Sequence, residues 1–427
     1  LEGASAPLPG HLAEARPGAA AGKAHAAPKL PASWKDLVFE ERRFELPSGE
    51  AARRVLANGT RAFVLRGVGE PSIRIEARIL GGSGEDPEGK EGLTQLAAGL
   101  LDEAGIPGMT PEALKKHLES LVAERTTSSD TDTHSVTMSV FPNDLDEGLR
   151  ILGLLLSDPA LDATAFARLK KAMLARIASR DTRMRGVTGR LYRKLLWGEV
   201  PETREPTRES VESITLDDIR ELLDARTGPS RMVLAVAGDI DADAMTGKLD
   251  ATLGQWKPEG VESWLPAAAG EVTAPARGLH LRPMPTSQGS VRVGQTTVTA
   301  THEDAPALRL LSAVLARRTF NTIRSVHGLA YQASARFAPS WRRASPFTVL
   351  FQTKNESVPF AIDLAVQELK RIRKEGPTAD EVEEAKKSLD AGFRRVFGRS
   401  FDSAGAFATL ETYGVALDLS LIHISEP

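Results

Sequence analysis

Two runs of alternating hydrophobic and polar residues predict strands with one buried face. In residues 72–80, isoleucine or alanine alternates with arginine or glutamate, and residues 290–299 follow a similar pattern. Successive side chains of a strand point to opposite faces, so alternation of this kind places the apolar residues on one face. Residues 231–239 are instead apolar almost throughout, which is typical of a fully buried strand.

Turn and capping signals predict the elements around these strands. Asn58-Gly59, between β-forming residues, predicts a hairpin over residues 55–65. Thr110 followed by Pro111 predicts a helix start. The other elements expected in the first half are a helix from residue 93, a long strand run over 126–141, and helices over 146–156, 163–180 and 213–224.

The same order of elements returns in the second half of the chain. Residues 258–278 are rich in Pro, Ala and Gly and predict a linker. After them we expect a strand (290–299), a helix (307–315), a strand, loop and helix (347–369), and a helix that begins at Thr378. We therefore predict an α+β fold of two tandem homologous repeats, residues 40–257 and 279–418, each a mostly antiparallel sheet with helices on one face.

Both ends of the chain are expected to lie outside the folded repeats. Residues 1–33 are rich in Ala, Pro and Gly, which predicts a disordered leader. The second repeat has no counterpart of the 231–239 strand or of the last helices of the first repeat, so we expect it to be truncated. Residues 419–427 are expected to be a non-native tail.

Composition narrows the function classes. The 427 residues include 54 basic and 57 acidic ones, a net charge of −3. The sequence therefore lacks the excess of positive charge that is typical of nucleic-acid-binding proteins. No stretch has the length of a membrane-spanning helix. The chain has no cysteine, which excludes disulfides and thiolate chemistry and fits an oxidising compartment. No phosphate-binding loop, nucleophile elbow or dinucleotide fingerprint is present.

The segment Arg324-Ser-Val-His-Gly-Leu-Ala-Tyr331 predicts a compact turn with one guanidinium and one phenol. Arg324 lies at the end of an expected helix, and Gly328 can adopt the positive φ that closes a helix. The segment resembles the Arg/Tyr segment of pitrilysin/insulinase-type zinc peptidases. The resemblance, which covers residues 50–418, implies a clamshell of two repeats in which Arg324 and Tyr331 hold the substrate backbone and the oxyanion. The chain lacks the glycine-rich loop that precedes this segment in active relatives, which leaves the aim of Arg324 open.

The zinc motif that the resemblance implies is missing. Active members carry His-x-x-Glu-His on the helix after a loop similar to residues 81–93, and a third ligand on a later helix. Aligned on that loop, Gln95 and Gly99 lie where the two histidines belong and Ala98 lies at the position of the glutamate. Ala175 lies where the third ligand is expected. We therefore predict no metal and no cofactor in this chain.

A different metal site is the alternative considered. Asp130, Asp132 and His134 alternate, so in a single strand they would share one face, and two carboxylates with an imidazole can bind a divalent ion. The competing interpretation, which we favour, is an exposed strand face near a sheet edge. His117 and Glu119 are two positions apart on a helix, where side chains diverge.

These observations favour a non-catalytic, substrate-binding subunit of a heterodimeric zinc peptidase. Arg324 and Tyr331 would contact an extended peptide, and zinc would lie on a partner subunit of the same family. The alternative is an inactive scaffold or assembly protein, similar to the core subunits of respiratory complex III. A standalone metalloendopeptidase is disfavoured by the missing ligands. We expect a periplasmic or otherwise extracytoplasmic location.

Overall fold

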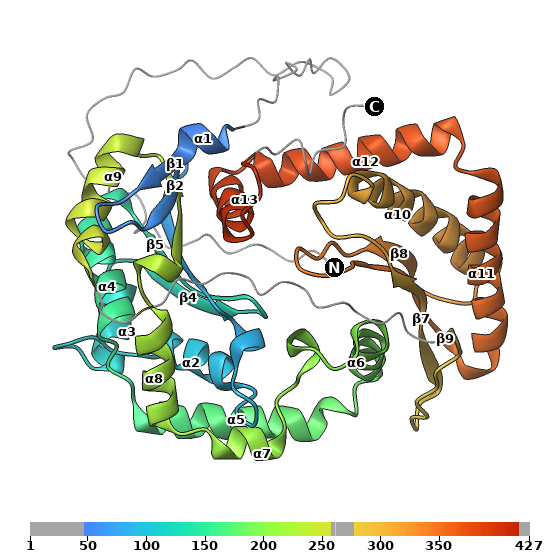
Figure 1. The fold of residues 1–427 in the computed structure, drawn as a ribbon, viewed down its shortest axis with the longest axis horizontal. Coiled ribbons are helices and arrows are strands. Elements are labelled where there is room, and N and C mark those ends of the chain that lie inside the picture. The colour runs from blue at the N-terminus through green and yellow to red at the C-terminus, as the bar shows by residue number, and fades with distance from the viewer. Residues whose placement is uncertain (1–46, 258–260, 262–276, 418–427) are drawn as a thin grey trace, which may run out of the picture. The chain divides into compact units, whose positions relative to one another are not determined.

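A computed structural model of the protein describes residues 47–257, 261 and 277–417 (Figure 1). The expected leader, the expected tail and nearly all of the expected linker lie outside these residues. The described part is an α+β fold with two sheets, as predicted. Its organisation as tandem repeats in a clamshell remains a prediction.

The first sheet has six strands in the order β1-β2-β6-β3-β5-β4. All neighbouring pairs are antiparallel except β2 and β6, which are parallel. The strands are β1 (Arg53–Val55), β2 (Arg61–Arg66), β3 (Ile73–Leu80), β4 (Glu124–Ser129), β5 (Thr133–Val140) and β6 (Met232–Gly238). The Asn58-Gly59 hairpin is confirmed: β1 and β2 pair across it, and Gly59 has φ +88°.

Amphipathic helices cover one face of the first sheet and build the larger core. Leu96 and Leu100 of α2 pack there with Ile75 and Ile79 of β3, and these side chains are at most 2% exposed. The helices of this half are α1 (Gly49–Ala52), α2 (Leu93–Asp102), α3 (Pro111–Ser120), α4 (Leu145–Ser157), α5 (Ala163–Arg180), α6 (Met184–Trp197), α7 (Arg208–Ser213), α8 (Leu216–Arg226) and α9 (Ala242–Ala251). The Thr110 cap of α3 forms as predicted, because its hydroxyl accepts a hydrogen bond from the Ala113 amide.

The second sheet has three described strands in the antiparallel order β7-β9-β8, a pattern that matches β3-β5-β4 of the first sheet. The strands are β7 (Gln288–Thr296), β8 (Ala333–Phe337) and β9 (Pro346–Lys354). The helices that follow the linker are α10 (Ala305–Thr319), a π-helix (Phe320–Val326), α11 (Val358–Glu375), α12 (Ala379–Phe397) and α13 (Ser400–Thr412). A second core forms between this sheet and α10 and α11.

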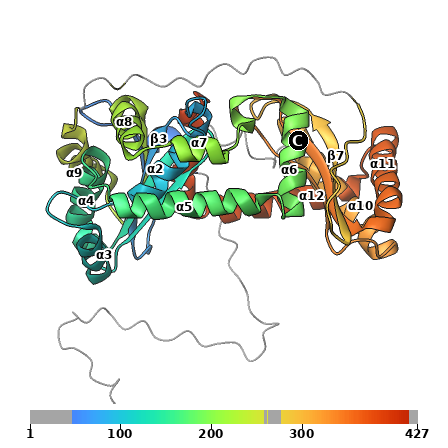
Figure 2. The same cartoon turned by 90° about the horizontal axis from the view of Figure 1, so that it is seen from below.

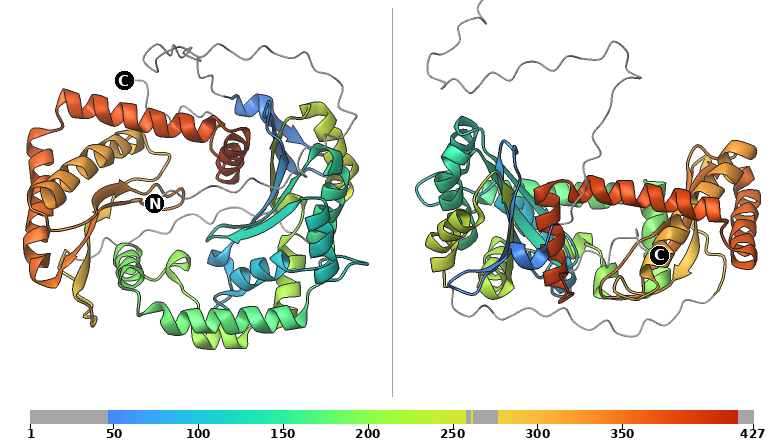
Figure 3. Two further views of the ribbon diagram at one scale, coloured as in Figure 1. Left: turned by 180° about the vertical axis from the view of Figure 1, so that it is seen from behind. Right: turned by 90° about the horizontal axis from the view of Figure 1, so that it is seen from above.

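The first sheet is also covered on its other face, by a helix from the second half of the chain. α12 runs toward the first sheet and α13 lies against it (Figures 1 and 3). Phe407 of α13 is fully buried, with its ring 5.9 Å from that of Phe63 on β2. Arg78 of β3 donates to the hydroxyl of Thr409 at 2.7 Å.

The second sheet receives a helix from the first half in the same way. α5 leads to α6, and α6 stands beside β7 (Figure 2). Thr348 of β9 donates to the hydroxyl of Tyr192 at 2.9 Å, and the indole of Trp197 donates to the Ala344 carbonyl at 3.0 Å. The prediction of helices on one face only is therefore wrong for both sheets. Each half of the chain covers the second face of the other half's sheet, through α13 and α6.

The expected continuous strand over residues 126–141 is also wrong. The chain reverses between β4 and β5, which pair as an antiparallel hairpin. The carboxylate of Asp130 fixes the turn by accepting from the amides of Asp132 and Thr133, both at 2.8 Å. An aspartate that bonds the backbone two residues ahead competes with an extended strand.

Candidate functional site

The segment that contains Arg324 is a π-helix, which widens the end of α10. α10 passes directly into Phe320–Val326 without an intervening loop. Gly328 closes the turn with φ +62°, as predicted, and its amide donates to the Arg324 carbonyl at 3.0 Å. Short π-helices inside or after α-helices occur frequently at functional sites.

Arg324 and Tyr331 lie next to each other. The guanidinium carbon of Arg324 is 4.8 Å from the centre of the Tyr331 ring and 4.9 Å from the centre of the Phe320 ring. Two aromatic faces hold the cation by its attraction to their π-electrons and leave its N–H groups directed elsewhere. No other described residue forms a hydrogen bond or ion pair with this guanidinium, and the Tyr331 side chain is 78% exposed.

The turn around this pair is anchored on three sides. Ile323 is fully buried in the second core. Thr322 donates to Glu368 of α11 at 2.7 Å, and Thr353 of β9 donates to the Leu329 carbonyl at 2.6 Å. These contacts fix the backbone on both sides of Arg324, so the exposed pair is presented from a rigid support.

A hollow of about 520 Å³ begins beside this pair, on the α6 side of the second sheet. Phe320 lines it and also contacts Arg324. Arg185 of α6, Arg292 of β7 and Ser334 of β8 contribute to the walls. Sequence reasoning missed this hollow because α6 and β7 lie about a hundred residues apart in the chain.

The positions that replace the family's zinc ligands lie on α2 and α5, which pack against each other. Gln95 is exposed, Ala98 is buried, and Gly99 faces Leu169 of α5, where an added Cβ would lie 3.7 Å from the leucine side chain. Ala175 is exposed on α5. In the described parts of the chain, no three histidine, aspartate or glutamate side chains are grouped closely enough to hold a metal ion.

Asp130, Asp132 and His134 do not form a shared face. Asp130 and Asp132 belong to the turn, and Asp132 pairs with Arg342 at 2.6 Å and accepts from the Tyr413 hydroxyl at 2.5 Å. His134 is 1% exposed, so its assignment to the surface is wrong. His117 is partly buried and lies 2.7 Å from Glu147.

His134 gives a prediction about stability and pH. Burial is the main cause that lowers the pKa of His134 to about 4, and its Nε2 atom has no hydrogen-bond partner among the described residues. The unfolded chain therefore binds a proton near pH 6.5 that the folded chain does not accept until about pH 4. Because of this group, we expect the free energy of unfolding to fall by about 2 kcal/mol between pH 7.5 and pH 5. Urea unfolding of His134→Leu at both pH values should show a correspondingly smaller loss.

The matched control for this measurement is His302→Gln, since His302 lies on the surface with its side chain 44% exposed. We expect this variant to keep the pH dependence of the unchanged protein. Equal pH dependence in His134→Leu and the unchanged protein would contradict the assignment of the buried neutral imidazole.

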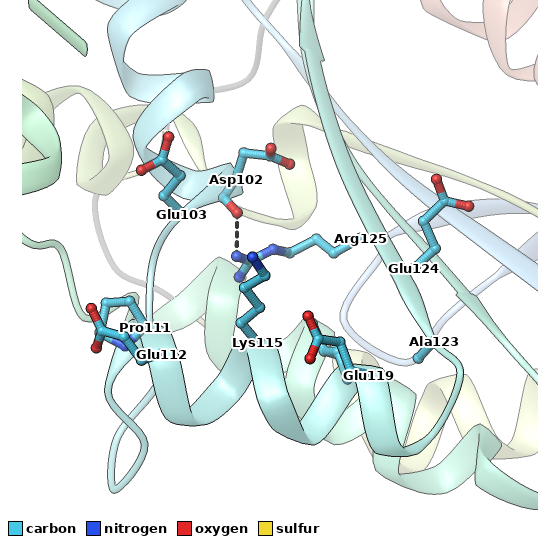
Figure 4. Close-up of a pocket in the computed structure, with 10 residues that line it drawn as sticks. Asp102, Glu103, Pro111, Glu112, Lys115, Glu119, Ala123, Glu124 and Arg125 are labelled. Atoms are coloured by element: carbon cyan, nitrogen blue, oxygen red, sulfur yellow. Dashed lines mark hydrogen bonds between the residues drawn. The ribbon is translucent and has the colours of Figure 1, made fainter. Parts of the chain in front are cut away.

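A second hollow, of about 550 Å³, lies at the end of α2 beside β4 (Figure 4). Arg125 donates to the carbonyl of Asp102, the last residue of α2, and to the carbonyl of Ala104 just beyond it. Burial raises the pKa of Asp102, and the nearby Arg125 charge opposes that rise. The hollow also contains the carboxylates of Glu103, Glu112, Glu119 and Glu124. Its arginine is engaged by backbone carbonyls, and among the described residues its carboxylates are not grouped closely enough to hold a metal ion.

Comparison with known proteins finds a match to an M16 peptidase family over part of the chain. Residues 213–389 match the family described as "Peptidase M16 inactive domain". A non-peptidase homolog, YmxG, from Helicobacter pylori is 23% identical over 324 residues, 74% of this chain and 73% of that protein. An uncharacterised zinc protease from Mycobacterium leprae is 30% identical over 168 residues, 38% of each protein.

Solved structures share the fold. A peptidase M16 inactive domain from Pseudomonas fluorescens superposes with a TM-score of 0.78 at 19% sequence identity, over 87% of this chain and 90% of that one. The family-level resemblance deduced from the Arg/Tyr segment and the order of elements is thereby confirmed. The roles expected for Arg324 and Tyr331 stay predictions.

Proposed function

Since residues 213–389 of the chain match the inactive domain of M16 peptidases, we propose that the chain is a substrate-binding subunit of a heterodimeric zinc peptidase. In this role Arg324 and Tyr331 contact an extended peptide and stabilise the oxyanion formed at the scissile carbonyl. The zinc ion and the general base belong to a partner subunit of the same family.

The observation that carries this proposal is the state of Arg324. Its guanidinium is held between two aromatic rings on an anchored turn and has no hydrogen-bonding partner among the described side chains and backbone groups. A charged donor and a phenol presented together from a rigid support suit an oxygen that gains negative charge. A structural arginine is usually paired with a carboxylate, as Arg318 is with Glu381 at 2.6 Å.

The residues at the expected zinc-binding positions support the assignment of zinc to another chain. Gln95, Ala98, Gly99 and Ala175 offer no imidazole or carboxylate at the positions where the family binds zinc. We therefore propose that the chain alone holds no zinc. We further propose an extracytoplasmic location, which a chain without cysteine suits. No helix among the described residues is long and apolar enough to cross a membrane.

The test is reconstitution with a zinc-bearing M16 relative from the same genome. We expect the two chains to co-elute in size-exclusion chromatography and to cleave peptides only together. Elemental analysis should find zinc in the partner and less than a stoichiometric amount in this chain alone. Tight binding of one zinc per isolated chain, or cleavage by that chain, would contradict the proposal. Co-elution without any effect on the partner's turnover would favour the scaffold alternative.

A further inference from the structure

The second sheet presents a row of polar and basic side chains on the face that α6 covers. In the register of this sheet, Arg292 lies opposite Leu350, and Leu350 lies opposite Ser334. Their neighbours along the strands, such as Val349 and Ala333, belong to the second core on the other face. Because side chains alternate between faces, Arg292 and Ser334 point to the α6 side.

The hollow beside Arg324 opens over this row, and none of the described residues that line it is acidic. Arg185 from the first turn of α6 lies on its wall, and the Arg185 Nε donates to the Gln352 side chain at 2.6 Å. That first turn of the 14-residue helix has no acidic residue. Its polar lining comprises Arg185, Ser290, Arg292, Gln332, Ser334 and Gln352.

The charge of Arg292 is not neutralised by the described protein. Arg292 lies over the Tyr192 ring at 5.8 Å and forms no ion pair with any described carboxylate. Partial desolvation lowers the pKa of Arg292, Tyr192 opposes this change, and the nearby cations Arg193 and Arg336 lower the pKa further. Like charges held together without a counter-ion cost free energy, which a bound anion recovers.

We propose that this hollow is a subsite for an acidic side chain, so that the chain selects peptides with a glutamate or aspartate close to the residue held by Arg324 and Tyr331. The inference rests on the proposed function, because it takes a peptide as the ligand. A carboxylate over Leu350 can accept from the guanidinium of Arg292 and from Arg185. Phe320 lines the hollow and its ring also contacts Arg324. One extended peptide can therefore reach both the hollow and Arg324.

The chemistry favours a peptide over a nucleic acid as the source of the anion. The hollow of about 520 Å³ is lined by two arginines, and the net charge of the whole chain is −3. A nucleic-acid interface needs a basic stripe that follows several phosphates. A single carboxylate needs only a local pair of guanidinium groups.

The experiment is a competition between two peptide pools on the immobilised full chain. The pools have identical random flanks and differ only in a central glutamate or glutamine. We expect about tenfold enrichment of the glutamate pool at low salt, a difference typical of one charge-assisted hydrogen bond. The enrichment should shrink at high salt, because these guanidinium groups are accessible to solvent ions.

Two variants locate the effect. Arg292→Gln should reduce the enrichment to less than twofold, and Arg185→Gln should reduce it partly. The matched control is Arg373→Gln, which removes an exposed arginine on α11 outside the hollow and should keep the full enrichment. An enrichment that survives in both Arg292→Gln and Arg185→Gln would overturn the assignment.

The remaining outcomes separate this inference from the proposed function. Equal capture of both pools, with loss of both in Arg324→Ala, overturns the acidic subsite and leaves the substrate-binding role intact. Capture of neither pool overturns both. A glutamate preference without any effect of Arg324→Ala on a partner's turnover keeps the subsite and rejects the catalytic partnership. Displacement of the glutamate pool by a thymidine oligonucleotide at lower concentration than by free glutamate-containing peptide would assign the hollow to nucleic acid instead.

Discussion

Replacement of Tyr331 by phenylalanine is expected to lower the turnover of the reconstituted complex by roughly a hundredfold to a thousandfold. The change removes one hydroxyl and keeps the ring that contacts Arg324, so the turn and its cation–π contact should survive. Loss of one donor to a developing oxyanion typically costs about 2.7–4 kcal/mol of transition-state stabilisation. The measurement is kcat on a peptide substrate, with complex formation checked by size-exclusion chromatography.

Arg324→Ala should cost at least as much, because it removes a charged donor, and it should also weaken peptide binding. Tyr413→Phe is the matched control: its hydroxyl donates to Asp132 inside the chain, so its loss should affect stability and leave turnover unchanged. Full turnover of an intact complex that carries Tyr331→Phe would reject the oxyanion role and support the scaffold alternative.

The largest effect on stability is expected from Phe407→Ala. Phe407 belongs to α13 in the second half of the chain, yet it is fully buried beside Phe63 of the first sheet. Truncation of a buried phenylalanine typically costs about 3–5 kcal/mol, as lost hydrophobic burial and a residual cavity. Urea unfolding should show this loss, and amide exchange of β6 should accelerate because the strand loses cover on one face.

Phe401→Ala is the control on the same helix. Phe401 is only partly buried and lies under Arg74 at 4.2 Å, so its removal should cost clearly less. A loss of less than about 1 kcal/mol in Phe407→Ala would show that α13 contributes little to the first sheet.

Most strands and helices could be predicted because their signals are local. The alternation in β3, the Asn-Gly turn between β1 and β2 and the cap of α3 each act within a few residues, and the structure confirms all three. The hairpin between β4 and β5 had a local signal too, in the aspartates of Ser-Asp-Thr-Asp. The β-forming residues on both sides of these aspartates favour one continuous strand and so conceal the turn.

Helices α6 and α13, each of which covers the sheet formed by the other half of the chain, could not be predicted from periodicity. α13 faces the first sheet with small residues, among them Ala404 and Ala408, which allow close approach but produce no strong apolar stripe. α6 contacts the second sheet through polar groups such as Tyr192. The available signal was in β6, which is buried at every position and therefore needs cover on both faces.

For the site, the identity of Arg324 and Tyr331 came from their local sequence, but their environment did not. The π-helix depends on how α10 meets α11 and β9, through contacts such as Thr322 with Glu368. The acid-free hollow depends on α6 and β7 meeting across the fold. Contacts between distant segments of this kind leave no periodic trace in the sequence.

The exchange of α6 and α13 has a consequence for how the chain folds during its synthesis. The face of the first sheet that contains Phe63 and Arg78 receives its cover only when residues 400–412 have left the ribosome, long after β6 is complete. Contacts separated by more than three hundred residues form slowly because a long loop must close first. Until then the apolar groups of this face, such as Phe63, are open to wrong partners, so a nascent chain that pauses after the first sheet should depend on chaperones.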